Sequence, residues 1–303
     1  MSSATLPAPA TRLSPLILAC LGATWFVWGS TYLAIKWALV SFPPFFQMGT
    51  RFVAAGLVLG LFAHWRGAAW PTREQWTSAF VLGALMLGCG YGATAFAQQS
   101  ISSGLVVAFI AVVPAVVALF ELPYGLRPSR LETAGITLGL AGIVLLTQGE
   151  GFGASGGGLL AMALACTGWC AGSVWAKHGL PGGRKLELAP GAAGYASQML
   201  AGGLLLLALS WGAGEQPTLP PDARSFACWV YLVVAGSLIG FSAYMLLLQR
   251  ASTALASSYT FVNPVIAMVL GVTVGGEVVG GGEMLAAGIV TASVVLLLAG
   301  RRG

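Results

Sequence analysis

Charged residues are scarce in this sequence: Asp, Glu, Lys and Arg make up only 8% of its 303 residues, whereas 57% are hydrophobic. A soluble domain carries roughly 25% charged residues, so this chain cannot cover itself with a surface wetted by water. Apolar runs recur along its whole length, and about 20 apolar residues suffice to span a bilayer. The sequence therefore predicts an all-α polytopic membrane protein. Runs that are continuous rather than alternating exclude a strand barrel.

Carboxylates are missing from the middle of every predicted span: Glu121 and Glu132 fall at span ends, and Glu277 and Glu283 lie in a loop. A proton-driven antiporter generally needs an ionisable group within the membrane, commonly a carboxylate. Proton coupling through a carboxylate is therefore not expected, and downhill facilitation is the default. A membrane enzyme would need clustered His, Asp or Glu, or a nucleophile beside a base, and the sequence has no such cluster.

Cysteines are few, and all five lie in apolar runs. Cys166 and Cys170 are one helical turn apart, but no His or carboxylate accompanies them. We therefore expect buried free thiols rather than metal ligands. The net charge of +5 does not indicate nucleic-acid binding, because the basic residues are scattered one or two per loop, as membrane orientation signals are. No cofactor and no metal are expected.

Ten spans are predicted, separated by segments rich in Pro, Gly and charged residues. They cover about residues 14–37, 43–63, 76–97, 103–121, 131–148, 157–176, 192–211, 225–248, 254–275 and 284–300. The first run is too long for a signal-peptide core and lacks an A-x-A exit, so we expect it to be retained. The expected organisation is a tail (1–13), a first five-helix repeat (14–148), a linker (149–156), a second five-helix repeat (157–300) and a tail (301–303).

A duplication organises these spans. The 41 residues from Phe80 fall without a gap on those from Val230, 150 positions later; eight are identical, which alone is near background. The pairs that agree in order include Gly90 with Gly240, Gln99 with Gln249, Ser102 with Ser252 and Pro114 with Pro264. Because each repeat has five spans, the second enters the membrane inverted. Such repeats are typical of transporters with a site near the midplane between them. Pro114 and Pro264 are predicted hinges, with Gly90 and Gly240 as close-packing points.

Lysines and arginines set the predicted orientation. With the N-terminus in the cytoplasm, eleven of the fourteen lie in inner segments. Positive charge concentrates on the cytoplasmic side of membrane proteins, so both termini are predicted to be cytoplasmic.

Span one carries Trp25, Trp28, Tyr32 and Lys36 at steps of three, four and four, which places them on one helical stripe. For Tyr32 and Lys36, an interfacial aromatic belt with a snorkelling lysine competes with a cavity contact. Trp25 and Trp28 are too deep for a belt, so lipid-facing packing or a cavity wall are the alternatives.

Arg51 lies eight residues into span two, roughly 12 Å below its outer end at about 1.5 Å per residue. A cation at that depth is costly and usually faces a wet interior or a partner. Arg51 could hold a substrate carboxylate, or it could cap carbonyls or snorkel outward, since Gln47 is one turn away. Lys36 and Arg51 are thus the candidate carboxylate or gate contacts.

Polar residues also follow one face of spans three and nine, among them Thr94 and Gln98 in the first and Thr260 and Asn263 in the second. Helix–helix hydrogen bonding and a polar cavity wall are equally good interpretations.

Small-xxx-small pairs occur in span five (Gly135 and Gly139) and span ten (Gly288 and Ala292). They predict close helix packing, within one chain in the ordinary case or across a dimer.

Two segments resemble a known family. WGSTYLAIKWAL with FPPFFQMGTRFVAAGLVL, and SSYTFVNPVIAMVLGVTVGGE in the second half, are similar to EamA-type members of the drug/metabolite transporter superfamily. One departure is Arg127, which stands thirteen residues after Pro114, where Glu277 stands after Pro264. The resemblance implies a bacterial inner-membrane carrier whose spans one, three, four, six, eight and nine line a central cavity, and we favour the aromatic amino acid exporter (YddG-like) group.

These features predict export of amino acids with aromatic or bulky apolar side chains by alternating access, by a protein in the lipid bilayer that is a monomer or, as the alternative, a dimer. The rivals are a drug or nucleotide-sugar carrier on the same fold and, in another class, a polytopic membrane enzyme. The predicted cavity wall consists of Trp25, Trp28, Tyr91, Trp169, Tyr244, Tyr259 and Asn263.

Overall fold

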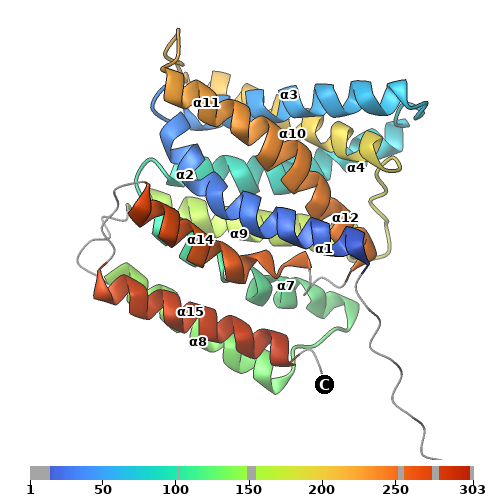
Figure 1. The fold of residues 1–303 in the computed structure, drawn as a ribbon. Coiled ribbons are helices and arrows are strands. Elements are labelled where there is room, and N and C mark those ends of the chain that lie inside the picture. The colour runs from blue at the N-terminus through green and yellow to red at the C-terminus, as the bar shows by residue number, and fades with distance from the viewer. Residues whose placement is uncertain (1–13, 102, 149–154, 252–255, 275–279, 301–303) are drawn as a thin grey trace, which may run out of the picture.

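The computed structural model describes residues 14–101, 103–148, 155–251, 256–274 and 280–300, and all the regular elements within these ranges are helices (Figure 1). The predicted tails (1–13 and 301–303) and nearly all of the linker (149–156) lie outside the described residues, as does Glu277. For some residues within helices, Pro264 among them, only the backbone is described.

The first five predicted spans correspond to helices α1 to α8. Their bounds are α1 (Pro15–Gly22), η1 (Ala23–Val27), α2 (Trp28–Ala38), α3 (Pro44–Trp65), α4 (Arg73–Gly83), η2 (Ala84–Gly92), α5 (Ala93–Ala97), α6 (Ser103–Ile110), α7 (Val113–Glu121), η3 (Leu122–Tyr124) and α8 (Arg130–Gln148). The later spans give α9 (Gly156–His178), α10 (Ala192–Gly212), α11 (Ala223–Tyr231), η4 (Leu232–Phe241), α12 (Ser242–Arg250), α14 (Tyr259–Thr273) and α15 (Gly281–Gly300).

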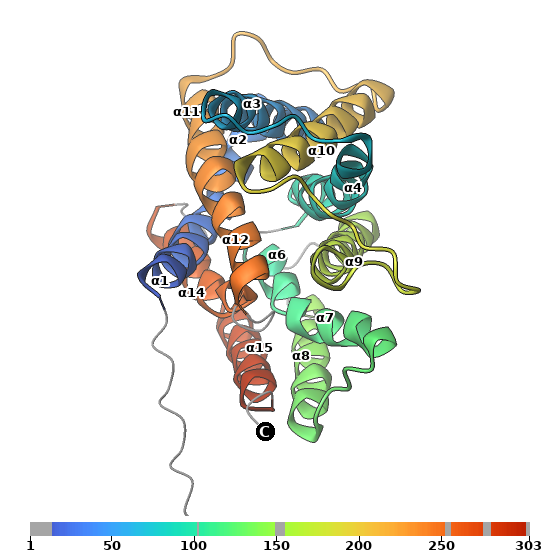
Figure 2. The same ribbon diagram turned by 90° about the vertical axis from the view of Figure 1, so that its right-hand side faces the viewer.

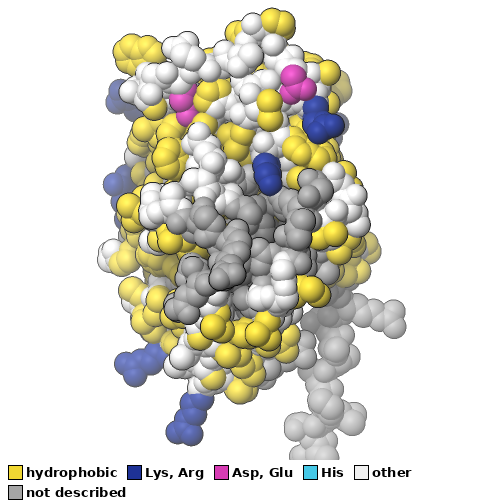
Figure 3. Space-filling view, turned by 90° about the vertical axis from the view of Figure 1, so that its left-hand side faces the viewer, with side chains coloured by type: hydrophobic (Ala, Val, Ile, Leu, Met, Phe, Trp, Pro, Cys, Tyr) yellow, Lys and Arg dark blue, Asp and Glu magenta, His cyan; other side chains and the backbone are white. Residues whose placement is uncertain are grey.

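Six helical stretches of the described chain are long and apolar enough to cross a membrane. They are Pro15–Ala38, Pro44–Trp65, Arg73–Ala97, Gly156–His178, Ala192–Gly212 and Ala223–Arg250. Shorter apolar helices occupy Val113–Tyr124 and Thr133–Gly142. In the described part of the face shown in Figure 3, most atoms are hydrophobic or neutral, and Lys and Arg side chains are few. The prediction of an all-α membrane protein is confirmed at this level.

Polar side chains fix where several helices begin. Thr72 and Gln75 form a capping box at the start of α4, which satisfies two otherwise unpaired backbone N–H groups. Asp222 caps α11 by accepting from Arg224 N (2.9 Å) and Ser225 N (3.0 Å). The Ser225 hydroxyl also donates to this carboxylate. The hydrogen bond from this hydroxyl, followed by the two backbone hydrogen bonds, holds the pKa of Asp222 below its ordinary value.

The helices lie side by side in one array, with α3, α4 and α10 at one end and the α8–α15 pair at the other (Figures 1 and 2). Small residues permit the closest approaches. A Cβ at Gly83 of α4 would lie 2.8 Å from the carbonyl oxygen of Gln198 in α10. No side chain larger than hydrogen fits there.

The predicted contact between spans five and ten forms within the chain, but through different residues than expected. A Cβ at Gly139 of α8 would lie 2.9 Å from Oγ of Ser293 in α15. The predicted partners Gly288 and Ala292 are exposed instead, and a Cβ added at Gly288 would have no described neighbour within 4 Å. The helix rotation about its axis places Ser293, the next residue, at the interface.

Replacing Gly139 by leucine should separate α8 from α15, because the new side chain would overlap Ser293. We expect the melting temperature of the purified protein in detergent to fall by at least 5 °C. Leucine at Gly288, where space is open, is the matched control and should leave it unchanged. Equal melting temperatures for both variants would contradict this interface.

Candidate functional site

In the described part of the chain, three helices switch to π-helical geometry in the middle of the molecule. These segments are η1 (Ala23–Val27), η2 (Ala84–Gly92) and η4 (Leu232–Phe241). Shifting 84–92 by the 150 residues of the duplication gives 234–242, which overlaps η4. π-helical turns are rare and frequently mark functional sites, and these three surround a single cluster of aromatic rings.

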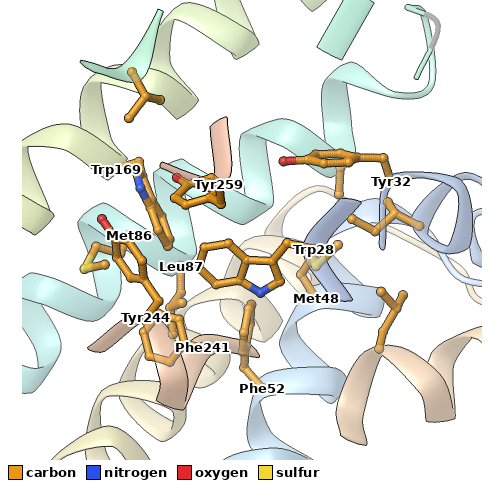
Figure 4. Close-up of a cluster of buried hydrophobic side chains, with 14 of the residues drawn as sticks. Trp28, Tyr32, Met48, Phe52, Met86, Leu87, Trp169, Phe241, Tyr244 and Tyr259 are labelled. Carbon is orange, nitrogen blue, oxygen red and sulfur yellow. The ribbon is translucent and has the colours of Figure 1, made fainter. Parts of the chain in front are cut away.

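Trp28 is the centre of that cluster. Its ring centroid lies 4.8 Å from that of Tyr259, 5.2 Å from that of Tyr244 and 5.6 Å from that of Trp169. Tyr91 is 5.6 Å from Trp169 and 6.4 Å from Trp28. Most pairs meet edge to face, the arrangement that ring quadrupoles favour. Figure 4 shows the Trp28 indole between Tyr259 on one side and Phe52 on the other, with Trp169 and Tyr244 beside it.

A cavity opens against this cluster. It holds about 510 Å³ of empty space, including the part open to the outside, and its lining is mainly apolar. The residues that define its chemistry are Trp28, Tyr32, Tyr91, Thr94, Trp169 and Tyr259. They come from five different helices, α2, η2, α5, α9 and α14. Concave, mostly apolar sites with a few polar groups are typical of small-molecule binding.

Four of the seven predicted wall residues line the cavity, namely Trp28, Tyr91, Trp169 and Tyr259. Tyr244 lies behind them, fully buried, with its hydroxyl 2.9 Å from Ser173 Oγ.

The other two predicted wall residues join span one to span nine beside the cavity. Trp25 Nε1 donates to Ser258 Oγ (3.0 Å). With its amide nitrogen turned toward the carbonyls, Asn263 donates to Trp25 O (2.8 Å) and Tyr259 O (3.1 Å). Among the alternatives for Tyr32, the cavity contact holds, because this side chain is buried in the lining. Lys36 is half-buried one turn beyond Tyr32 and does not line the cavity.

Arg51 is fully buried beside the Tyr91 ring. Its guanidinium carbon is 4.9 Å from the Phe52 centroid and 5.1 Å from the Tyr91 centroid. Nε donates to Ser237 Oγ (2.7 Å), Nη1 faces Met48 Sδ (3.6 Å), and Nη2 has no hydrogen-bond partner among the described residues. Tyr91 lines the cavity and Arg51 does not, so Arg51 places a charge next to a wall residue, and no carboxylate of the described chain pairs with it.

The two threonine hydroxyls of the lining are held by carbonyls of the preceding turn. Thr31 donates to the Trp28 carbonyl (2.8 Å) and Thr94 to that of Gly90 (2.7 Å). The buried thiols of Cys166 and Cys170 face the carbonyl oxygens of Phe109 and Val113, each at 3.5 Å. Both are free cysteines, as predicted.

The predicted hinge residues lie at interruptions of helical geometry. Between α6 and α7, residues 111–112 form a turn, and Pro114 sits in the first turn of α7. Pro264 lies within α14, which starts after a turn at 257–258. Gly90 and Gly240 lie in η2 and η4, where an added Cβ would meet Trp169 and Trp28, respectively.

Sequence reasoning missed the aliphatic part of the lining, namely Ile35, Ile110, Val113 and Ala165. Aliphatic residues in a membrane span carry no signal that separates a cavity wall from a lipid-facing surface. The π-helical turns were also missed, although the glycines in η2 and η4 could have indicated relaxed helical geometry.

Comparisons with known proteins identify relatives of this chain. The EamA-like transporter family matches the chain twice, over residues 4–148 and 156–299. The "Uncharacterized inner membrane transporter YedA" of Escherichia coli (strain K12) is 36% identical over 291 residues, 96% of this chain and 92% of that protein. Protein PecM of Dickeya dadantii (strain 3937) is 28% identical over 247 residues, 81% of this chain and 80% of that protein.

A solved crystal structure with 20% sequence identity superposes with a TM-score of 0.64 and covers 93% of this chain and 98% of its own. That likeness concerns the fold alone. The two family matches cover nearly the whole chain, and a relative shares more than a third of its residues over almost its full length. This protein belongs to the EamA-like transporter family, within the drug/metabolite transporter superfamily.

Proposed function

We propose that this protein exports amino acids with aromatic or bulky apolar side chains across the bacterial inner membrane by alternating access. The observation that carries the proposal is the cavity walled by Trp28, Tyr91, Trp169 and Tyr259. Flat apolar side chains stack well on such ring faces and edges. Arg51, one ring behind the wall, supplies positive potential that favours a carboxylate, and Lys36 is the second candidate for a carboxylate or gate contact.

The proposed architecture has ten spans in two inverted five-helix repeats, with both termini cytoplasmic. Support comes from the π-helical segments that recur at equivalent positions of the two halves. Further support comes from reciprocal packing, in which the first span of each repeat contacts the third span of the other repeat. A Cβ at Gly168 of α9 would lie 2.5 Å from Cβ of Cys89 in η2, and Trp28 of α2 donates to Gly236 of η4 (3.2 Å). Such an exchange is expected of two repeats that share a site.

In this orientation the lining residues of the first and third spans lie in the outer halves of those spans, since Trp28 to Ile35 are in the outer part of Pro15–Ala38 and Gly90 to Thr94 in that of Arg73–Ala97. The inner ends are tied together instead. The Tyr124 hydroxyl donates to the Gly179 carbonyl, and Lys177 Nζ donates to Ala251 O (2.9 Å). We therefore infer an outward-facing conformation, with transport not coupled to protons through a carboxylate.

The test is counterflow of labelled amino acids into liposomes that contain the purified protein. Phenylalanine, tryptophan and leucine should exchange at least tenfold faster than glycine or glutamate, because only the former fill an apolar aromatic cavity. Empty liposomes are the control. Flat traces for every amino acid, together with flux of a sugar or a cationic drug, would overturn the substrate class and favour the rival carriers.

A further inference from the structure

The two glycines paired by the duplication each lie against a tryptophan of the other half of the chain. A methyl group added at Gly240, in the second half, would lie 2.8 Å from Cδ1 of Trp28 and overlap its Nε1. One added at Gly90, in the first half, would lie 3.2 Å from Cε3 of Trp169. Real Cβ atoms essentially never approach below 3.0 Å. The contact is thus reciprocal, and both tryptophans line the cavity.

The two contacts are unequal in this structure. Trp28 is held by Gly240 and also by a hydrogen bond from its Nε1 to the Gly236 carbonyl (3.2 Å). A Cβ added at Gly90 would meet Trp169 at 3.2 Å, a tight contact that a shift of a few tenths of an ångström could relieve, and Trp169 Nε1 has no hydrogen-bond partner among the described residues. The first contact therefore fixes its indole more tightly than the second.

We propose that Gly240 and Gly90 are positioning residues for transport, each serving as the seat of the cavity tryptophan that the other half supplies. This proposal rests on the transport function proposed above. The centroids of Trp28 and Trp169 are 5.6 Å apart with the rings at 78°, so displacing either ring displaces the wall that the other forms. Because neither glycine has a side chain, the two tryptophans can take the positions that shape this part of the cavity wall.

A methyl group at Gly240 would push the Trp28 indole against its neighbouring rings or into the cavity that it lines. The Trp28 ring is packed against Tyr259 and Tyr244 at 4.8 and 5.2 Å between centroids, and its side chain is only 3% exposed. Gly240→Ala should therefore lower the counterflow rate of labelled phenylalanine at least tenfold. It should also raise the substrate concentration at half-maximal rate, which a mere loss of folded protein would leave unchanged.

A double-substitution cycle tests whether Gly240 acts through Trp28 rather than through Trp169. Phenylalanine has no atom at the position of the indole Nε1 and is small enough to turn within the space that the indole occupied. Trp28→Phe alone should cost about threefold, and adding Gly240→Ala should change that rate by less than twofold. The crossed combination, Gly240→Ala with Trp169→Phe, should stay as slow as Gly240→Ala.

Several results would contradict the proposed role of Gly240 as the seat of Trp28. They are a wild-type rate in Gly240→Ala, an unchanged half-maximal concentration, or equal rescue by Trp28→Phe and Trp169→Phe. If Gly240→Ala is not recovered as a monodisperse protein, recovery with Trp28→Phe but not with Trp169→Phe supports the seat, and recovery with neither contradicts it. If the wild type moves another solute instead of amino acids, the proposed substrate fails, and the same cycle run with that solute still tests the seat.

Discussion

Arg51→Met should lower the transport of carboxylate-bearing substrates by about thirtyfold and leave the fold at least as stable. The guanidinium lies 5.1 Å from the centroid of Tyr91, which lines the cavity. A substrate carboxylate in van der Waals contact with the opposite face of that ring, about 3.5 Å from it, would be about 8 Å away. At an effective dielectric constant of about 20, that separation corresponds to about 2 kcal/mol, or about thirtyfold in binding.

The expected gain in stability has a separate cause. Arg51 is fully buried, and within the described chain it has one hydroxyl, one thioether and two ring faces around it, but no carboxylate. A cation in the middle of a membrane helix costs about 2.5–3.5 kcal/mol on insertion scales. Methionine removes that cost and keeps a long apolar side chain, so function and stability should change in opposite directions.

Counterflow in liposomes and the melting temperature in detergent measure the two effects. Arg224→Met is the matched control, because Arg224 is exposed and lies 5.2 Å from the Trp37 centroid, away from the cavity. It should alter neither quantity by much. A cationic amine analogue of the substrate should be transported better by Arg51→Met than by the wild type. A parallel loss of stability and of transport for every probe would show that Arg51 is structural only.

Trp28→Ala should reduce transport more than a hundredfold. The indole touches Tyr91, Trp169, Tyr244 and Tyr259, so its removal takes away the surface that brings those rings together. In protein cores, replacing Trp by Ala costs about 3–5 kcal/mol, so stability should fall as well.

Phe241→Ala separates these two effects. Phe241 is fully buried in the same cluster, 6.5 Å from Trp169 and 6.4 Å from Phe52 between centroids, but does not line the cavity. Its removal should cost similar stability, yet lower transport less than tenfold at temperatures where both variants are folded. Equal losses of transport in the two variants would mean that Trp28 only supports the fold.

Much of the site could be predicted from periodicity and depth. The stripe from Trp25 to Lys36 placed Trp28 and Tyr32 on one face, and the depth of Arg51 marked it as costly. Both inferences need only one helix and its position in the bilayer. They could not separate Trp28, which lines the cavity, from Trp25, which is tied to Ser258 beside it. That difference depends on how α14 packs against η1.

The sequence by itself determined that this is a helical membrane protein, because so few charges and such long apolar runs leave no other way to satisfy the backbone. The duplication was also readable, since paired glycines and prolines keep their spacing. Only the tertiary structure decided which face of each helix meets which. Trp28 meets Gly240 and Trp169 across more than 140 residues of chain. Those contacts depend on close packing between helices of the two halves, which no local pattern encodes.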